Sequence, residues 1–200
     1  MTARIARSFS FTACVHFNNQ FYTNFYDIDL NFVVESDVIH EQNIAMERIK
    51  YFIAECMDSA LFINQSYTEA IEKYMEAGIR VCTLPEEPYD QIIGIMLLTK
   101  LNSITEGRLT VTDISTTSTM SDSVSCQHSI EESTGPFLLK GWWNNSLPDI
   151  TDVKQKNKKV VKLKKTKNDW DELSLGYKKK DIEENDQTIV FVSFEPKTEQ

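Results

Sequence analysis

The chain has 200 residues, of which 41% are hydrophobic and 26% are charged. This length suits one ordinary domain with an extension, and the apolar content is enough for a buried core, which excludes a wholly disordered protein. No apolar run approaches the roughly 18–20 residues that a membrane helix needs, so we expect no membrane contact. Two arginines near the N-terminus are followed by alternating residues rather than by an apolar run, so we expect no cleaved signal peptide.

Charge divides the chain into two unequal parts. The net charge of −9 comes from 21 basic and 30 acidic side chains. Residues 1–150 hold 9 Lys and Arg against 20 Asp and Glu, whereas residues 151–200 hold 12 against 10. The sequence therefore predicts an acidic body, which repels phosphate, joined to a basic segment.

Two stretches near the N-terminus alternate between apolar and polar residues, namely residues 8–17 and residues 25–35. Such alternation is typical of strands with one buried face. The polar residues 18–24 between them predict a hairpin loop.

Helical spacing follows the hairpin. Apolar residues recur every three or four positions across residues 43–60, which predicts a first helix. Residues 66–69 read Ser-Tyr-Thr-Glu, a capping-box pattern that predicts the start of a second helix ending near Gly78. Residues 80–84 predict a short strand. Residues 85–101 begin with two prolines and two glutamates and are then apolar nearly all round, so we expect a central core helix there.

Residues 108–114 and 124–130 predict two further strands. The resulting order β-β-α-α-β-α-β-β predicts an α+β fold with a mixed or antiparallel sheet and about three helices packed on one side. We expect this acidic globular domain to span residues 1–150. A C-terminal extension follows, with a lysine-rich arm or linker at residues 151–168 and a docking peptide and late strand at residues 169–200.

Four cysteines are spread over the body: Cys14, Cys56, Cys82 and Cys126. No pair has the short C-x-x-C spacing of a zinc or redox motif. Cys56 and Cys82 lie in apolar surroundings typical of reduced thiols, so we expect a reducing, cytoplasmic environment. We expect no cofactor, apart from a divalent metal in one alternative.

That alternative follows from the register expected for the hairpin. With both apolar faces pointing inward, a short loop places His16 opposite Asp27 and Cys14 opposite Asp29 on the outer face. Cysteine, histidine and carboxylates can ligate a transition metal, and His beside Asp is an acid–base pair. The alternative is therefore an enzyme in which His16 and Asp27 are catalytic and all four residues hold a metal. The other interpretation is a solvated sheet face.

The other sequence patterns that would indicate an enzyme are weaker, and the sequence favours a protein without catalytic activity. Asp113, Asp122 and His128 lie near several serines, but no nucleophile-elbow pattern such as G-x-S-x-G occurs. Serine-rich turns also need these residue types to satisfy backbone groups. The absence of a glycine-rich phosphate loop disfavours Walker-type and Rossmann enzymes.

Residues 153–168 contain eight lysines and no acid. Uncompensated ammonium groups bind polyanions in a salt-dependent, sequence-independent way, which predicts a nucleic-acid-associated protein as a further alternative. Trp142 and Trp143, if exposed, would stack on unpaired bases; the other interpretation is that they anchor the domain surface while the lysines keep a linker extended. The predicted polyanion-binding residues are Lys158, Lys159, Lys162, Lys164 and Lys165.

Residues 169–175 read Asp-Trp-Asp-Glu-Leu-Ser-Leu. The surrounding acids repel phosphate, so Trp170 is a poor base-stacking residue. Trp170 with Leu173 and Leu175, after a flexible arm, forms the pattern of a peptide that docks into a hydrophobic groove of a protein partner. The other interpretation is that this segment folds back onto its own domain.

Together these features favour a small intracellular adaptor or regulatory protein that binds a protein partner through the C-terminal Trp/Leu segment. Its composition, rich in Asn and Lys, would suit a viral accessory protein. The hairpin enzyme and the lysine-arm nucleic-acid protein are the two alternatives. Exposed strand edges would also permit self-association.

Overall fold

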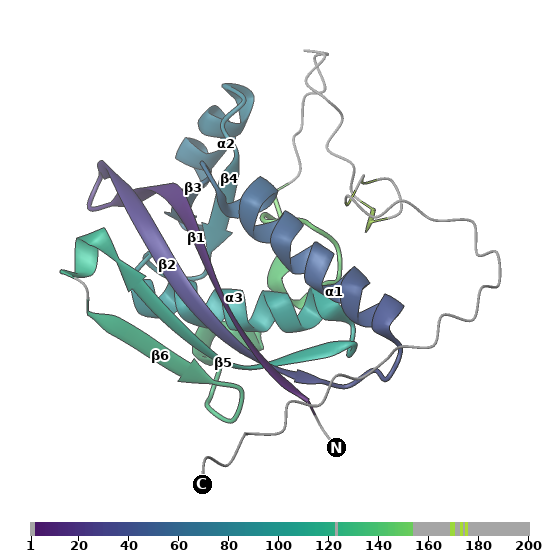
Figure 1. Cartoon of the computed structure of the whole chain (residues 1–200). Coiled ribbons are helices and arrows are strands. Elements are labelled where there is room, and N and C mark those ends of the chain that lie inside the picture. The colour runs from purple at the N-terminus through teal and green to yellow at the C-terminus, as the bar shows by residue number, and fades with distance from the viewer. Residues whose placement is uncertain (1–2, 123, 154–168, 171–172, 174, 176–200) are drawn as a thin grey trace, which may run out of the picture.

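A six-stranded mixed sheet, in the order β4-β3-β1-β2-β5-β6, forms the centre of the computed structural model (Figure 1). The structure describes residues 3–122, 124–153, 169, 170, 173 and 175. The strands are β1 (Arg4–Phe17), β2 (Gln20–Val34), β3 (Leu61–Asn64), β4 (Val81–Leu84), β5 (Leu109–Ser118) and β6 (Ser125–Ser129). The helices are α1 (Ile39–Tyr51), α2 (Thr68–Glu76) and α3 (Asp90–Thr105). The π-helix η1 (Phe52–Met57) continues α1, and three short 3-10 helices are η2 (Thr119–Ser121), η3 (Gly135–Leu138) and η4 (Trp142–Asn144). The predicted α+β class with a mixed sheet is confirmed.

The hairpin of β1 and β2 closes through a shorter loop than the sequence suggested. Asn18 and Asn19 both have positive φ, 51° and 58°, as in the two-residue turns that favour Asn and Gly. The predicted loop over residues 18–24 is therefore wrong beyond Asn19, because two asparagines suffice to reverse the chain and residues 20–24 extend β2.

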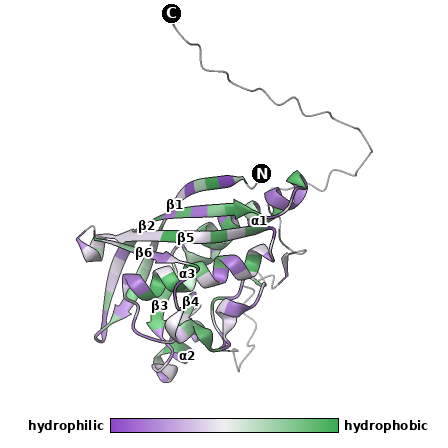
Figure 2. Ribbon diagram, turned by 90° about the horizontal axis from the view of Figure 1, so that it is seen from below, coloured by the Kyte–Doolittle hydropathy of each residue, from purple (hydrophilic) through white to green (hydrophobic). Residues whose placement is uncertain are grey.

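Helices α1 and α3 cover one face of the sheet. Phe11 and Val15 from β1, and Ile28 and Leu30 from β2, pack into the same core as the apolar side chains of α3. Helix α3 lies against β5 and β6 of the sheet (Figure 2). The prediction of a central core helix is confirmed, since most of α3 is buried.

Strand β3 is missing from the elements predicted from the sequence, because three consecutive apolar residues followed by an asparagine do not distinguish a strand from a helix end. It pairs in parallel with β1 and β4. Ile71 of α2 packs against Leu61 and Ile63 of β3 in a second, smaller cluster that also includes Cys14. Because Cys14 points away from the main core, α2 covers the opposite face of the sheet from α1 and α3.

The capping box predicted at Ser66 is absent. Helix α2 begins at Thr68 after Tyr67, whose side chain makes no cap hydrogen bond. The Ser66 N–H instead donates to Asn64 Oδ1 at 2.9 Å, which makes a local turn after β3.

The segment after β6 wraps around the body and contributes two tryptophans to the core. Trp142 and Trp143 are 0% and 2% exposed. The Trp142 indole N–H donates to the Thr83 carbonyl at 2.8 Å, and that of Trp143 donates to the Leu139 carbonyl at 3.0 Å. The prediction that these rings stack on bases is therefore wrong, and their alternative role as anchors is correct. Within the described ranges, no helix is both long and apolar enough to cross a membrane.

Candidate functional site

The hairpin does not bring together the four residues predicted to form a metal or acid–base site. The register places His16 opposite Phe21 and Cys14 opposite Thr23, whereas Asp27 lies opposite Ser10. His16 and Asp27 are thus about 20 Å apart along the strands. The expected register was wrong because the tight Asn18–Asn19 turn shifts every pair while keeping the same faces inward.

His16 and Asp29 have other neighbours. His16 is 5% exposed, and its ring lies 4.8 Å from the ring of Tyr67, the residue that precedes α2. Asp29 accepts a hydrogen bond from Ser8 Oγ at 2.5 Å on the outer sheet face. In the part of the chain that the structure describes, no cluster of three or more His, Cys, Asp or Glu side chains is arranged to hold a metal ion. The His16–Asp27 catalytic pair and the four-residue metal site are therefore not formed.

The weaker triad is not assembled either. Asp113 points to the exposed face of β5, opposite Ser129, whereas His128 lies on the inner side of β6. The His128 Nδ1 atom lies 3.8 Å from the Glu132 carboxylate. Asp122 follows η2 in a left-handed conformation with φ of 50°. The serines of this region make local hydrogen bonds, as with Ser115 and Ser125 at 2.7 Å.

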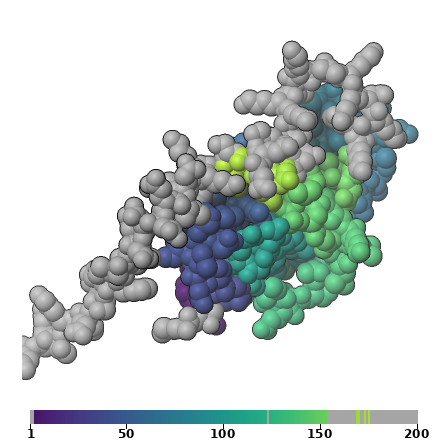
Figure 3. All heavy atoms as spheres, turned by 90° about the vertical axis from the view of Figure 1, so that its right-hand side faces the viewer, coloured from purple at the N-terminus to yellow at the C-terminus, as the bar shows by residue number. Residues whose placement is uncertain are grey.

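Trp170 is the predicted partner-binding residue that the structure places most clearly, and it lies on its own body. Its side chain is 5% exposed, and Figure 3 shows the described C-terminal residues resting between α1 and the wrapping segment. The indole N–H donates to the Ser146 carbonyl. The Arg48 guanidinium lies 5.1 Å from the ring centre, and the Tyr51 ring packs edge-on at 6.0 Å. We call Arg48, Tyr51 and Ser146 the Trp170 site.

Leu173 and Leu175 extend this contact. Both are partly buried and pack against the main core. The Leu173 N–H donates to the Trp170 carbonyl at 3.2 Å. The fold-back interpretation that the sequence left open is thus the conformation seen. The predicted lysine arm spans residues 151–168, of which only residues 151–153 are described, so Lys158, Lys159, Lys162, Lys164 and Lys165 lie outside the described residues.

An ionic network holds Arg48 in place beneath Trp170. Arg48 Nη1 donates to the Ile104 carbonyl at 3.0 Å and to Glu106 at 2.7 Å, and Arg108 Nη1 lies 2.6 Å from the same carboxylate. Partial burial would raise the pKa of Glu106, but the hydrogen bonds from Arg108 and Arg48 hold it down at about 2. Glu106 is therefore ionised at neutral pH, and Arg48 presents its charge to the indole with its orientation fixed.

A buried lysine shapes the other wall of the Trp170 site. Lys100 of α3 is 0% exposed, and its Nζ donates to the carbonyls of Asn145 and Leu147 at 3.0 and 2.6 Å. These two residues flank Ser146, whose carbonyl accepts the Trp170 indole N–H. Further acceptors are the Trp142 carbonyl at 2.8 Å and the Asn145 side chain at 2.9 Å. Lys100 therefore orders the loop that receives Trp170.

Sequence reasoning missed Arg48, Tyr51 and Lys100. Arg48 and Tyr51 lie on a helix whose apolar stripe predicted only contacts with the core. Lys100 is a single cation in an otherwise apolar helix. An isolated lysine in a nearly continuous apolar run was the available signal, because a buried cation needs several oxygen acceptors. Ser146 contributes its backbone carbonyl, so its residue type does not indicate its role.

No family model matches the sequence, and no curated protein matches it. Among solved structures, an uncharacterized protein from Wolinella succinogenes is 14% identical, with a TM-score of 0.45 over 66% of this chain and 99% of that chain. The 6-pyruvoyltetrahydropterin synthase of Plasmodium vivax is 11% identical, with a TM-score of 0.40 over 65% of this chain and 99% of that one. The Plasmodium falciparum enzyme is 13% identical, with a TM-score of 0.39 over 64% and 99%. All three TM-scores lie below 0.5.

Proposed function

We propose that this chain is a small regulatory protein that binds a protein partner through its C-terminal Trp/Leu segment, and that its own body holds this segment until a partner competes for it. The observation that carries the proposal is the burial of Trp170. An indole supplied from beyond residue 168 is 5% exposed in a site built by α1 and the wrapping segment. The body therefore carries a receptor for a tryptophan peptide.

The residue types in this contact support a binding role. Trp, Tyr and Arg are the residues that most often dominate the energy of protein interfaces, and all three meet here. The guanidinium of Arg48 also suits a tryptophan flanked by acids, such as Asp169 and Asp171. A partner that offers a similar aromatic and basic groove would meet the same segment equally well.

The contact is also small enough to exchange. Its described direct interactions are one indole hydrogen bond, one cation–π contact, one edge-on ring contact and the packing of Leu173 and Leu175. A cation–π contact contributes about 0.5–2 kcal/mol and an aromatic pair about 0.5–1.5 kcal/mol. The burial of Trp170 adds to these contributions, and a partner groove that offers equivalent contacts would compete for the segment.

Two variants test the proposal. Tyr51→Ala removes a wall of the Trp170 site and should release the segment while leaving its sequence intact. In cross-linking capture from the native cell, Tyr51→Ala should retain a partner more strongly than the unaltered chain does. The double variant Tyr51→Ala/Trp170→Ala should lose that partner, because the anchor is gone.

Tyr74→Ala is the matched control, since Tyr74 is a partly buried tyrosine on α2, far from the Trp170 site. It should capture no more than the unaltered chain. Retention of the same partners by the double variant would contradict a docking role for Trp170.

A further inference from the structure

Strand β1 has a free backbone edge over its first half. In the sheet order, β3 is the neighbour of β1 on this side, but their pairing covers only Cys14 and Val15 of β1. The contact nearest to that pairing is at Thr12, whose carbonyl accepts from the Ser59 N–H at 2.6 Å. Along residues 4–10, the described part of the chain places no strand beside this edge.

The hairpin register decides which backbone groups face this free edge. The Val34 N–H donates to the Ala3 carbonyl at 3.0 Å, so the odd-numbered residues of this half of β1 direct their backbone groups toward β2. The N–H and C=O groups of the even-numbered residues therefore point to the free side. These residues are all exposed and are Arg4, Ala6, Ser8 and Ser10. A row of unpaired backbone groups is a template for a further strand.

The side chains along this edge are apolar on the inner face, and the edge is basic. Ile5 is 39% exposed and Phe9 is only partly buried, with the Arg7 guanidinium 5.8 Å from the Phe9 ring centre. Arg4 and Arg7 are both exposed, and the chain has no acidic residue before Asp27. An apolar strand with acids at its ends would cover these side chains and complement their charge.

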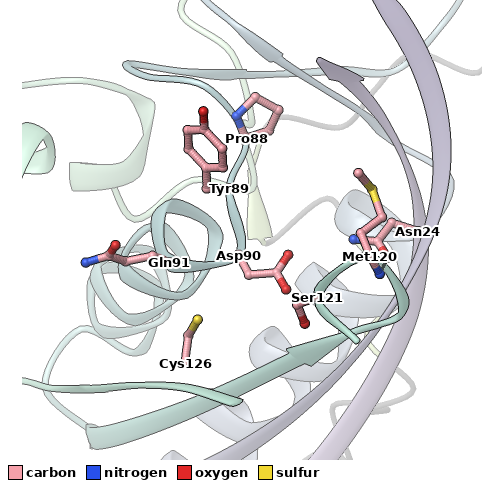
Figure 4. A pocket seen from close by; sticks show the side chains of 8 residues that line it. All are labelled: Asn24, Pro88, Tyr89, Asp90, Gln91, Met120, Ser121 and Cys126. Carbon is pink, nitrogen blue, oxygen red and sulfur yellow. Dashed lines mark hydrogen bonds between the residues drawn. The ribbon is translucent and has the colours of Figure 1, made fainter. Parts of the chain in front are cut away.

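The two outermost strands of the sheet suit such a segment less well. The edge of β4 already borders the wrapping segment, since the Thr83 N–H donates to the Ile150 carbonyl at 3.1 Å. The edge of β6 is acidic, because two glutamates follow the strand at residues 131–132. Figure 4 also shows Cys126 of β6 beside the start of α3, where Asp90 carries a carboxylate. An acidic segment would be repelled from β6, which leaves β1 as the favoured edge.

The C-terminal part of the chain contains a segment with the required chemistry. Residues 188–194 read Thr-Ile-Val-Phe-Val-Ser-Phe, a run of β-branched and aromatic residues that predicts the late strand. This segment lies outside the described residues. Residues 181–186 before it contain four acids and no base, and Glu195 follows it. The segment is thus apolar with acidic flanks.

The chain is also long enough to bring this segment to β1. Leu175 packs on the body, and the residues between it and the segment, 176–187, span up to about 40 Å when extended. Trp170 contacts Tyr51, and the helix η1 that follows Tyr51 is no longer than about 10 Å. The residues after η1 bond to Thr12, so the free edge begins within roughly 30 Å of Trp170.

We propose that residues 188–194 pair with the free edge of β1 and add a further strand to the sheet. Their backbone groups bond to those of the even-numbered residues in the first half of β1. Their apolar side chains cover Ile5 and Phe9, and the flanking acids lie near Arg4 and Arg7. This pairing does not depend on the proposed role of the Trp170 segment in binding a partner.

The test is amide hydrogen exchange of the full chain, followed by NMR residue by residue. The Ala6 and Ser8 amides face the free edge, whereas the Arg7 and Phe9 amides bond to β2. In the double variant Val190→Pro/Phe191→Pro, the segment loses two adjacent backbone donors and cannot pair as a strand. We expect the Ala6 and Ser8 amides to exchange at least about tenfold more slowly in the unaltered chain than in this variant. The Arg7 and Phe9 amides should be equally protected in both, because the hairpin is intact.

The matched control is Thr198→Pro/Glu199→Pro, which places two prolines in the chain beyond the segment and should keep the slow exchange at Ala6 and Ser8. Equal exchange of these two amides in the unaltered chain and in Val190→Pro/Phe191→Pro would overturn the proposal. Loss of their protection in the control would do the same. Protection that increases with protein concentration would also overturn it, because the occupant of the edge would then be a second copy of the chain.

Discussion

Lys100 shows, at the scale of one residue, how this body holds a charge in its core. Its Nζ donates to oxygens of Trp142, Asn145 and Leu147, and the Phe52 ring lies 5.8 Å away. Burial lowers the pKa of Lys100 to about 8, although the nearby carboxylates of Asp149 and Asp152 raise it in part. The side chain thus carries its charge at neutral pH and loses it at mildly alkaline pH.

This shift predicts how stability depends on pH. Because the pKa of Lys100 is lower in the folded chain than its usual 10.5, the unfolded chain binds more protons between about pH 8 and 10.5. Folding stability from this residue therefore rises with pH across that window, by at most about 1.4 kcal/mol per pH unit. Denaturant unfolding at several pH values should show this rise for the unaltered chain relative to Lys100→Met.

The comparison with Lys100→Met is needed because other groups act in the opposite direction. Burial raises the pKa of Cys56 to about 12, so its contribution to stability falls as the pH rises above about 9. Cys56 is present in both proteins, so the difference reports Lys100 together with its electrostatic coupling to Cys56. Lys73→Met, on the exposed side of α2, should give a difference that is flat with pH. A flat difference for Lys100→Met as well would show that this prediction is wrong.

Between elements, the contact of α3 with β5 and β6 depends on Gly94. A Cβ at this position would lie 2.9 Å from His128 Cδ2 and 3.0 Å from Thr116 Oγ1, closer than packed atoms tolerate. We expect Gly94→Ala to lower the free energy of unfolding by about 1–3 kcal/mol, since an inserted methyl in a packed core forces its neighbours to move. Chemical denaturation measures this change.

The second substitution His128→Ala tests the cause. It removes the closest atom, so the cost of Gly94→Ala should be clearly smaller in a His128→Ala background. A cost of the same size in both backgrounds would mean that the loss does not come from this contact.

The elements also show what could be predicted from the sequence. Alternation predicted both hairpin strands and their inward faces, because a period of two is fixed by strand geometry. The register depended on the turn, and the positive φ values of Asn18 and Asn19 were not anticipated. The predicted hairpin site depended on that register, so it failed although the strands were correct.

The Trp170 site could be predicted only in part. The acid-flanked tryptophan was identified from its composition. Its receptor brings together Arg48 and Tyr51 with the Ser146 carbonyl, which lies about a hundred residues later in the chain. These residues become neighbours only when α1 packs against the wrapping segment. Neither the periodicity of the sequence nor the spacing of its residues predicts that contact.

For the whole molecule, the division of charge gives a prediction for the lysine arm. If residues 154–167 bind DNA, the logarithm of the binding constant should fall linearly with the logarithm of salt concentration, with a slope no steeper than about −7 for eight lysines. Replacing Lys158, Lys159, Lys162, Lys164 and Lys165 by Gln should make the slope shallower. Binding that does not change with salt would contradict a role for the arm.

The proposed function requires that the body holds a receptor for the segment around Trp170. The most direct measurement is fluorescence anisotropy with a labelled peptide of residues 167–177, added to the full-length Trp170→Ala variant and to the unaltered chain. We predict saturable binding to Trp170→Ala and at least tenfold weaker binding to the unaltered chain, whose site is already filled, with no binding of a peptide that carries Ala in place of Trp170. Equal binding to both proteins, or no binding to Trp170→Ala, would contradict the claim.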